Sequence, residues 1–401
     1  MVKTPARSII GAIDAASARW MDPDFEPRVR ARDAACARTG YSLAVVDYAF
    51  DRLFGELRAD AIEAIVADEL GCFAVLDRFT AGDGRPKVRA IPIGRVCIIS
   101  SRTTIGVAIP AAVFAMCAKC SVLVKDREDY LVASFFKTLA EELPELGEWI
   151  SARPWSGAAS SAEIAAYDAV VAFGDDATLA QLASQLGVSS RFIGYGSKAS
   201  AGYVTRESLS HEAEARSIAR GAALDLTLYE AEGCLSLHTL FVENGGAMSV
   251  ARFAELLAEA LRETAREFPP AIADAAAAAR RAAARDLALF RSSVAIHSDR
   301  AAGYLIIVDP PFEEPPLFLP QTIGIRAVDD TLAAAKYFAR HRIAVEGLAV
   351  SGRRNDLLEL AASCKAARVA PFGTLQAPPL RAFHGGRPRI AEFVRWLGDE
   401  T

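Results

Sequence analysis

The spacing of hydrophobic positions changes near residue 88 of this chain. Through residues 59–70 (ADAIEAIVADEL), apolar side chains recur every three or four positions, the period of an amphipathic helix, and residues 1–85 contain no alternating run of strand length. Gly82 and Pro86 then mark a boundary, because glycine and proline interrupt regular elements. The pattern predicts a helical N-terminal region over residues 1–87.

From residue 88 onward, short apolar runs alternate with helix-like stretches. Strands are expected at 96–100, 121–124, 168–173 and 191–193, with helices at 108–118, 129–142 and 176–186. Parallel neighbouring strands need a crossover, which is usually a helix. The alternation therefore predicts a parallel sheet of the nucleotide-binding kind over residues 88–205.

A second series of strands and helices follows over residues 206–375. Strands are expected at 239–242, 305–308, 322–326 and 348–351, and helices at 207–223, 249–266, 272–290 and 328–341. The C-terminal segment, 376–401, contains a short amphipathic stretch around 393–396 that is expected to be helical and to pack back on the N-terminal half. Together these patterns predict an α/β protein with two parallel-sheet domains and a helical N-terminal region.

Composition narrows the class of protein. The chain has 401 residues, 52% of them hydrophobic, and a net charge of −5 from 45 basic and 50 acidic residues. No basic face for nucleic acid is implied, and no apolar run reaches the ~20 residues of a membrane span. The N-terminus lacks the pattern of a secretory signal. Seven cysteines, an odd number in a large chain, suit a reducing cytoplasm, so we expect a cytoplasmic protein.

Cys234 is the first candidate for chemistry. It follows Gly233 where a helical region passes into an apolar strand, and such a turn can expose the sulfur. His238 lies four residues later, and a nearby imidazole can activate a cysteine nucleophile. The alternative is that Cys234 is a small buried hydrophobic residue and that His238 is structural.

Cys117 and Cys120 form a CxxC pair that we do not expect to bind metal. Zinc would need two further ligands at suitable spacing, and none is near. A redox pair would place its first cysteine at the start of a helix, whereas this pair follows one. The sequence therefore predicts no metal site.

Several residues lie at predicted strand ends, where a parallel sheet binds nucleotides. Phe173 and Gly174 begin a turn into a helix whose N-cap is expected at Asp175 or the next residue. An acidic cap competes with phosphate, so a pyrophosphate would lie beside this helix end. Gly196 belongs to a glycine-rich strand exit, and Lys125 ends a buried strand. An ordinary turn and a solvated lysine remain the alternatives for these last two.

Five short motifs, taken in their order along the chain, are similar to the aldehyde dehydrogenase superfamily: Pro92-Ile-Gly94-Arg-Val96, Val122-Leu-Val-Lys125, Phe173-Gly174, Gly196-Ser-Lys198 and Gly233-Cys234. More narrowly, the chain resembles the LuxC-type acyl-CoA reductases, through Thr39-Gly40-Tyr41-Ser42, His384-Gly385-Gly386 and the segment 393–396. The resemblance extends from about residue 20 to 397.

The resemblance implies an aldehyde dehydrogenase-like fold and NAD(P)H-dependent reduction of a fatty acyl-CoA, or another acyl thioester, to the aldehyde. Cys234 would be the covalent nucleophile, and Lys125 would contact the adenosine ribose or its phosphate. Phe173, Gly174 and Gly196 would lie along the cofactor. Lys125 and Arg127 would both face a 2′-phosphate, which favours NADPH over NADH. A homo-oligomer is also implied, of a size that the sequence leaves open.

Two departures from the superfamily pattern affect the mechanism. Aldehyde-oxidising members carry a glutamate at the start of the strand-exit loop, which activates water, and no glutamate occurs from 190 to 206. Its loss favours thioester reduction over aldehyde oxidation. The position of the oxyanion-hole asparagine matches Arg102, so Arg102 or Thr103 would donate to the oxyanion beside the Cys234 N–H. His238 is the candidate general acid.

Two other functions stay open at this point. One is a CoA-acylating aldehyde dehydrogenase that acts on a small substrate. The other is a non-catalytic protein that keeps the fold, because both the asparagine and the glutamate positions have changed.

Overall fold

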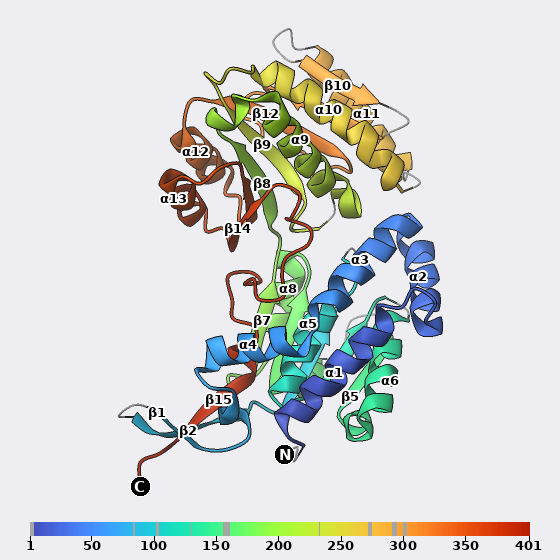
Figure 1. Ribbon diagram of the computed structural model, residues 1–401, viewed down its shortest axis with the longest axis vertical. Helices are drawn as coiled ribbons and strands as arrows, with labels where there is room; N and C mark the ends of the chain where they lie inside the picture. Colours follow the sequence, from blue (N-terminus) through green and yellow to red (C-terminus); the bar gives the residue numbers. More distant parts are fainter. Residues whose placement is uncertain are drawn as a thin grey trace.

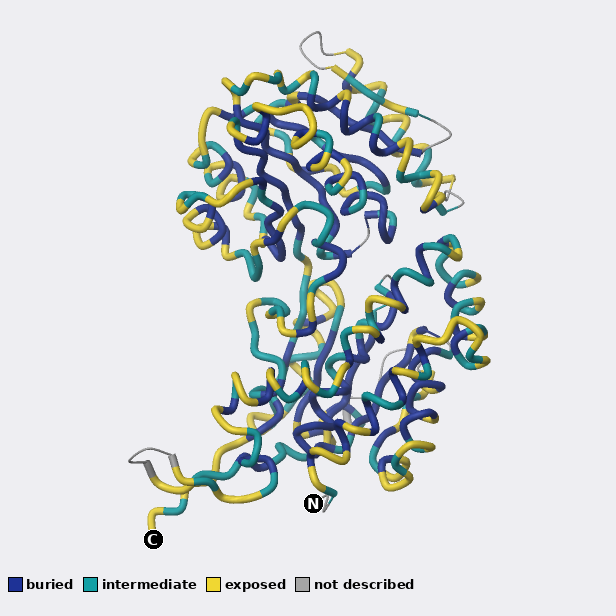
Figure 2. Tube along the Cα trace, viewed as in Figure 1, coloured by how far each residue is buried: buried dark blue, intermediate teal, exposed yellow. Residues whose placement is uncertain are grey.

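The computed structural model describes residues 4–82, 85–101, 104–128, 130–154, 161–231, 233–271, 275–290, 295–299 and 303–401. Figure 1 shows two lobes stacked along the long axis of the molecule, with the N-terminal helices and the first large sheet in the lower lobe and the second in the upper lobe. In both lobes the buried positions follow the central strands (Figure 2). No helix among the described residues is long and apolar enough to cross a membrane.

The lower lobe begins with four helices: α1 (Ala6–Trp20), α2 (Glu26–Thr39), α3 (Leu43–Glu56) and α4 (Ala59–Leu70). Their core is aromatic. The Trp20 ring is fully buried, lies against Phe54 and Phe135, and donates its indole N–H to Thr138 at 3.1 Å. The expected helical N-terminal region is confirmed, but it does not extend to residue 87, because Thr80–Gly82 and Arg85–Pro92 are strands.

A five-stranded, all-parallel sheet forms the centre of the lower lobe, in the order β5-β4-β3-β6-β7. Its strands are β3 (Arg95–Ile99), β4 (Ser121–Asp126), β5 (Ile150–Pro154), β6 (Ala169–Phe173) and β7 (Arg191–Tyr195). The connecting helices are α5 (Ala108–Cys117), α6 (Leu131–Glu142), α7 (Ser161–Ile164) and α8 (Asp176–Ala183). Helix α5 is buried almost throughout because it lies between this sheet and the N-terminal helices.

A seven-stranded sheet of order β10-β11-β12-β9-β8-β13-β14 forms the upper lobe, and every pair except β10–β11 is parallel. The strands are β8 (Ala199–Val204), β9 (Leu237–Glu243), β10 (Ala295–Asp299), β11 (Tyr304–Val308), β12 (Thr322–Val328), β13 (Val345–Val350) and β14 (Arg368–Pro371). The helices are α9 (Glu212–Thr227), α10 (Val250–Glu267), α11 (Ala275–Leu289), α12 (Thr331–His341) and α13 (Asn355–Ser363). The expected two-sheet α/β architecture is confirmed.

A three-stranded antiparallel sheet extends from the lower lobe and unites distant parts of the chain (Figure 1). It contains β1 (Thr80–Gly82), β2 (Arg85–Pro92) and β15 (Val394–Asp399). The helix expected around 393–396 is wrong, because this segment pairs with β2 over six residues, from Val394 opposite Pro92 to Asp399 opposite Lys87. Only a short helical turn, Ala391–Phe393, precedes the strand.

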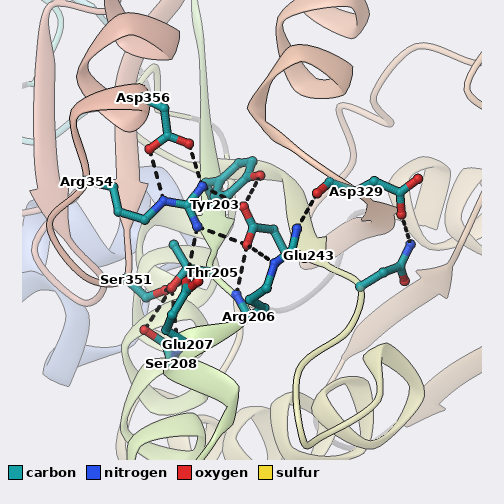
Figure 3. A network of polar contacts seen from close by, with 11 residues as sticks. Tyr203, Thr205, Arg206, Glu207, Ser208, Glu243, Asp329, Ser351, Arg354 and Asp356 are labelled. Carbon is teal, nitrogen blue, oxygen red and sulfur yellow. Dashed lines mark hydrogen bonds and ion pairs between the residues drawn. The ribbon is translucent and has the colours of Figure 1, made fainter.

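A polar network closes the carboxyl ends of the upper-lobe strands (Figure 3). The carboxylate of Glu243, whose side chain is fully buried, accepts hydrogen bonds from the Tyr203 hydroxyl at 2.7 Å, from Arg354 at 2.8 Å and from the Arg206 backbone N–H at 3.0 Å. Burial alone would raise the pKa of Glu243, but these donors outweigh it and lower the pKa to about 2. The carboxylate therefore stays charged and links β8, β9 and the loop after β13.

Candidate active site

The two large sheets face each other across a cleft of about 1630 Å³. One wall contains the carboxyl ends of β6 and β7, with Phe173, Gly174 and Tyr195. The opposite wall contains the segment before β9 and the amino end of β13, with Cys234 and Glu346. The carboxyl edge of one parallel sheet thus meets the amino edge of the other, and residues far apart in sequence share one cavity.

Cys234 is placed by a strained turn between α9 and β9. Three non-glycine residues in succession, Tyr229, Glu230 and Ala231, have φ between 53° and 59°, in the left-handed region. Such conformations persist only where surrounding contacts enforce them, and they concentrate at functional sites. Here the Tyr41 hydroxyl donates to the Tyr229 carbonyl at 3.3 Å, and the Glu230 carboxylate accepts from the backbone N–H of the loop after α10 at 2.8 Å.

The thiol of Cys234 is protonated at neutral pH in this setting. Burial, and after it the negative charge of Glu346, raise its pKa to about 12, although Lys198 opposes the rise. A cysteine nucleophile reacts as the thiolate. Reaction at Cys234 therefore requires a group that removes the proton as the sulfur attacks.

Lys198 and Glu346 form an ion pair beside Cys234. The ammonium of Lys198, one residue before β8, lies 2.7 Å from the Glu346 carboxylate, whose side chain is only 3% exposed. The other carboxylate oxygen accepts the Gly385 N–H at 2.8 Å. Neither charged residue was assigned a role from sequence. The available signal was a glutamate within the otherwise apolar run Val345–Val350.

An aromatic stack covers the carboxyl ends of β6 and β7. The rings of Phe173 and Tyr195 are 4.9 Å apart and 11° from parallel, and the His384 ring lies 4.2 Å from Tyr195 and 5.6 Å from Phe173. Burial lowers the pKa of His384 to about 4, so the ring is neutral. The next residue, Gly385, has φ +62°, and an added Cβ would lie 3.0 Å from the Tyr195 ring, which explains the glycine.

His238 lies on β9 and also lines the cleft. Burial lowers the pKa of its imidazole to about 4, so it is neutral at pH 7. Its Nδ1 has no hydrogen-bond partner among the described residues, and its ring meets the edge of Phe318 at 4.8 Å. The structure thus brings His238 and Cys234 into one cavity.

The predicted nucleotide residues divide into two groups. Phe173, Gly174 and Gly196 line the cleft, whereas Lys125 and Arg127 are not among the described residues that line it. An added Cβ at Gly174 would meet only Thr178, at 3.8 Å, so this position opens toward the cleft. At Gly196 the added atom would lie 2.3 Å from Asp176 Oδ1, so packing within the protein explains that glycine.

The amino end of α8 is closed by its own side chains. Asp175 is the N-cap, with its carboxylate accepting from the Thr178 N–H at 2.8 Å and from the Thr178 hydroxyl at 2.9 Å. The Asp176 carboxylate accepts the Ser197 N–H at 2.9 Å. A phosphate at this edge would therefore lie beside the helix end, because two carboxylates already occupy it.

Arg102 and Thr103, the candidate oxyanion donors, lie outside the described residues. The segments on either side of them are joined by Glu128. Its buried carboxylate accepts from the Gly106 N–H at 2.7 Å and from the Ser100 hydroxyl at 3.2 Å. Burial raises the pKa of Glu128 to about 7. Thr104, the first described residue after the gap, lines the cleft.

The CxxC pair lies away from the cleft. Cys117 and Cys120 are both fully buried in the lower lobe, and the Cys120 thiol donates to the Phe393 carbonyl at 3.4 Å. In this structure the two cysteines are small side chains of the hydrophobic core.

Comparisons with known proteins agree with this architecture. Residues 1–396 match the family model described as "Acyl-CoA reductase (LuxC)". No curated protein matches the chain. A NAD-dependent benzaldehyde dehydrogenase from Corynebacterium glutamicum shares 16% identity, with 99% of this chain and 86% of that chain covered and a TM-score of 0.72. An oxidoreductase from Marinobacter aquaeolei shares 13% identity over 99% and 86%, with a TM-score of 0.76. The aldehyde dehydrogenase KauB from Pseudomonas aeruginosa shares 14% over 98% and 84%, with a TM-score of 0.72.

Proposed function

The chain belongs to the LuxC family of acyl-CoA reductases, oxidoreductases that form aldehydes, and from this premise we propose that it reduces a fatty acyl-CoA through an acyl-enzyme at Cys234. One observation carries the proposal. Cys234 lies in a cleft between the amino ends of the upper-lobe strands and the carboxyl ends of the lower-lobe strands, where a parallel sheet receives a nucleotide.

In the first half of the proposed reaction, Cys234 Sγ bonds to the thioester carbonyl carbon and the bond from that carbon to the CoA sulfur breaks. In this proposal the Cys234 N–H and a donor from Arg102 or Thr103 would stabilise the developing oxyanion. In the second half, a nicotinamide cofactor bound beside Phe173 and Gly174 would supply hydride to the acyl carbon. Cys234 Sγ then leaves the reduced carbon, and the aldehyde is released. His238 stays the proposed proton donor, to Sγ as it leaves the reduced carbon. Because its imidazole is neutral, one ring nitrogen can give up its proton only as the other ring nitrogen takes one up.

The apolar part of the cleft lining suits a fatty acyl chain. Apolar side chains line part of it, namely Ala277 and Ala278 of α11 and Phe318, Leu319 and Pro320 of the loop before β12, and Arg280 and Arg281 of α11 line it as well. Each methylene moved from water onto such a surface contributes about 0.8 kcal/mol. Binding energy should therefore increase with chain length until the wall is covered.

We expect kcat/KM for acyl-CoA reduction to rise about fourfold per added methylene between about 4 and 12 carbons. The experiment follows cofactor absorbance and aldehyde release for a series of acyl-CoAs. Ala278→Phe should flatten the increase for long chains, and Ala282→Phe, on the exposed side of the same helix, should leave it unchanged. Absence of aldehyde from every acyl-CoA would refute the proposed function.

We also propose NADPH as the preferred cofactor, with Lys125 and Arg127 facing the 2′-phosphate. The support is their position, at and just beyond the carboxyl end of β4 in the nucleotide-type sheet, with Arg127 exposed. Charge-assisted contacts contribute about 1.5–3 kcal/mol. Arg127→Ala is therefore expected to raise KM for NADPH at least about tenfold and to change KM for NADH little. Equal effects on the two cofactors would rule out this assignment.

A further inference from the structure

The hydroxyl of Ser200, on β8, connects the segment before β9, which contains Cys234, to β13. This hydroxyl donates to the Cys234 carbonyl at 2.9 Å and accepts the Gly347 N–H at 3.0 Å. Lys198 is two residues before Ser200, and Glu346 is the residue before Gly347. The hydrogen bonds therefore place the Lys198–Glu346 ion pair at the same junction as Cys234, and all three side chains belong to the lining of one cleft.

The carboxyl group of Glu346 is held in a defined orientation. One oxygen accepts from Lys198 at 2.7 Å and the other from the Gly385 N–H at 2.8 Å. Arg368 and Arg389 act on it electrostatically from two other segments, while the adjacent His384 ring is neutral. A buried carboxylate with these neighbours is compensated in charge, and each of its oxygens keeps a further lone pair for a proton.

A proton acceptor is needed at this place. The Cys234 thiol is uncharged at neutral pH, and the strand-exit loop from 190 to 206 contains no glutamate. Glu346 reaches the cleft from β13 instead, so the carboxylate comes from a different strand of the sheet.

We propose that the Lys198–Glu346 ion pair exchanges the proton of Cys234 during acyl transfer, an inference that rests on the proposed function. As Sγ bonds to the thioester carbon, Glu346 accepts the thiol proton. When the carbon–sulfur bond to CoA breaks, that proton passes to the CoA sulfur, which leaves as the thiol. The exchange converts one thiol and one thioester into another thiol and thioester, with no change in redox state. Lys198 orients the carboxylate and stabilises negative charge on Sγ.

Two reactions of the same sulfur test this inference. Alkylation of Cys234 by iodoacetamide requires only the thiolate, whereas acylation by an acyl-CoA without cofactor also requires return of a proton to the leaving group. Glu346→Gln removes a negative charge beside the sulfur, so alkylation at neutral pH should become faster. Acylation should become at least about tenfold slower, because positioned proton transfer contributes roughly 10²–10⁴-fold.

Lys198→Met is the second variant. It removes a positive charge that stabilises the Cys234 thiolate, so both alkylation and acylation should become slower. Glu392→Gln serves as the matched control, since Glu392 lines the same cleft but pairs with Arg387 at 3.1 Å; both of its rates should stay within about twofold of wild type. Peptide mass analysis assigns each modification to Cys234.

Opposite changes in alkylation and acylation for Glu346→Gln would support the proton-exchange role. If both rates fell by the same factor, or if neither changed, the ion pair would be only structural and the inference would be wrong. A wild-type protein that is alkylated at Cys234 but acylated by no acyl-CoA would instead refute the proposed function.

Discussion

Cys234→Ala is expected to abolish acyl-enzyme formation and to lower aldehyde production by at least about 10⁴-fold. Alanine removes the atom that bonds to the acyl carbon, and loss of a covalent nucleophile has cost about 10⁶-fold in kcat where it has been measured in other enzymes. The measurement is incubation with a radiolabelled acyl-CoA without cofactor, followed by denaturation and counting of bound label. Steady-state aldehyde formation is then measured separately.

Cys72→Ala provides the control for this substitution. Cys72 is an exposed cysteine of the N-terminal region and does not line the cleft, so its variant should retain both the label and the turnover of wild type. Wild-type turnover in Cys234→Ala would show that another group carries the acyl chain. Label that persists with lost turnover would assign Cys234 to the reductive half of the reaction alone.

Glu243→Ala is expected to lower the free energy of unfolding by about 3–5 kcal/mol at neutral pH, because it leaves Arg354, Arg206 and the Tyr203 hydroxyl without their buried acceptor (Figure 3). The pKa of Glu243 is about 2, below its ordinary 4.5. Its charge-dependent stabilisation, about 3 kcal/mol, is therefore fully present above pH 4.5 and is lost as pH falls toward 2.

Urea unfolding of wild type and variant, compared between about pH 7 and pH 3, measures this difference. The gap between the two proteins should narrow as the medium becomes acidic. Glu207→Ala is the comparison, because Glu207 contacts Arg354 at 3.1 Å but its side chain is 64% exposed, and exposed ion pairs contribute about 0–1 kcal/mol. A gap that is constant with pH would show that lost packing, and not the buried charge, causes the destabilisation.

The fully buried parallel strands could be predicted from sequence because their hydrophobicity is continuous. The runs at 96–100, 121–124 and 168–173 became β3, β4 and β6, and the alternation with helices predicted the parallel sheets. These strands are covered on both faces, so nearly every position is apolar and the signal is strong even over five residues.

Other strands gave no such signal. Strand β8 (Ala199–Val204) is buried at all six positions, yet it consists largely of small residues and follows a glycine-rich segment, so no strand was expected there. In β15, Trp396 and Leu397 are about half exposed. An exposed strand shows its pairing only in the partner, here β2, which lies some 300 residues earlier in the chain.

Residues of the candidate site could be predicted from sequence only where a reactive or conformationally permissive residue lies at a predicted turn. Cys234 after Gly233, and Gly174 after Phe173, combine a reactive or permissive residue with a strand end. Glu346 lacked this coincidence, because a glutamate inside an apolar strand says nothing of which residue it faces. Its proximity to Lys198 depends on the pairing of β8 with β13, a contact between residues 148 positions apart.

The segment that contains His384 and Gly385 touches both lobes at once. The His384 ring stacks on Tyr195 of the lower sheet, while the next backbone N–H binds Glu346 of the upper sheet. Any widening of the space between the lobes must separate one of these two contacts. Entry of a bulky thioester and the orientation of the carboxylate next to the sulfur are thus mechanically linked through two consecutive residues near the end of the chain.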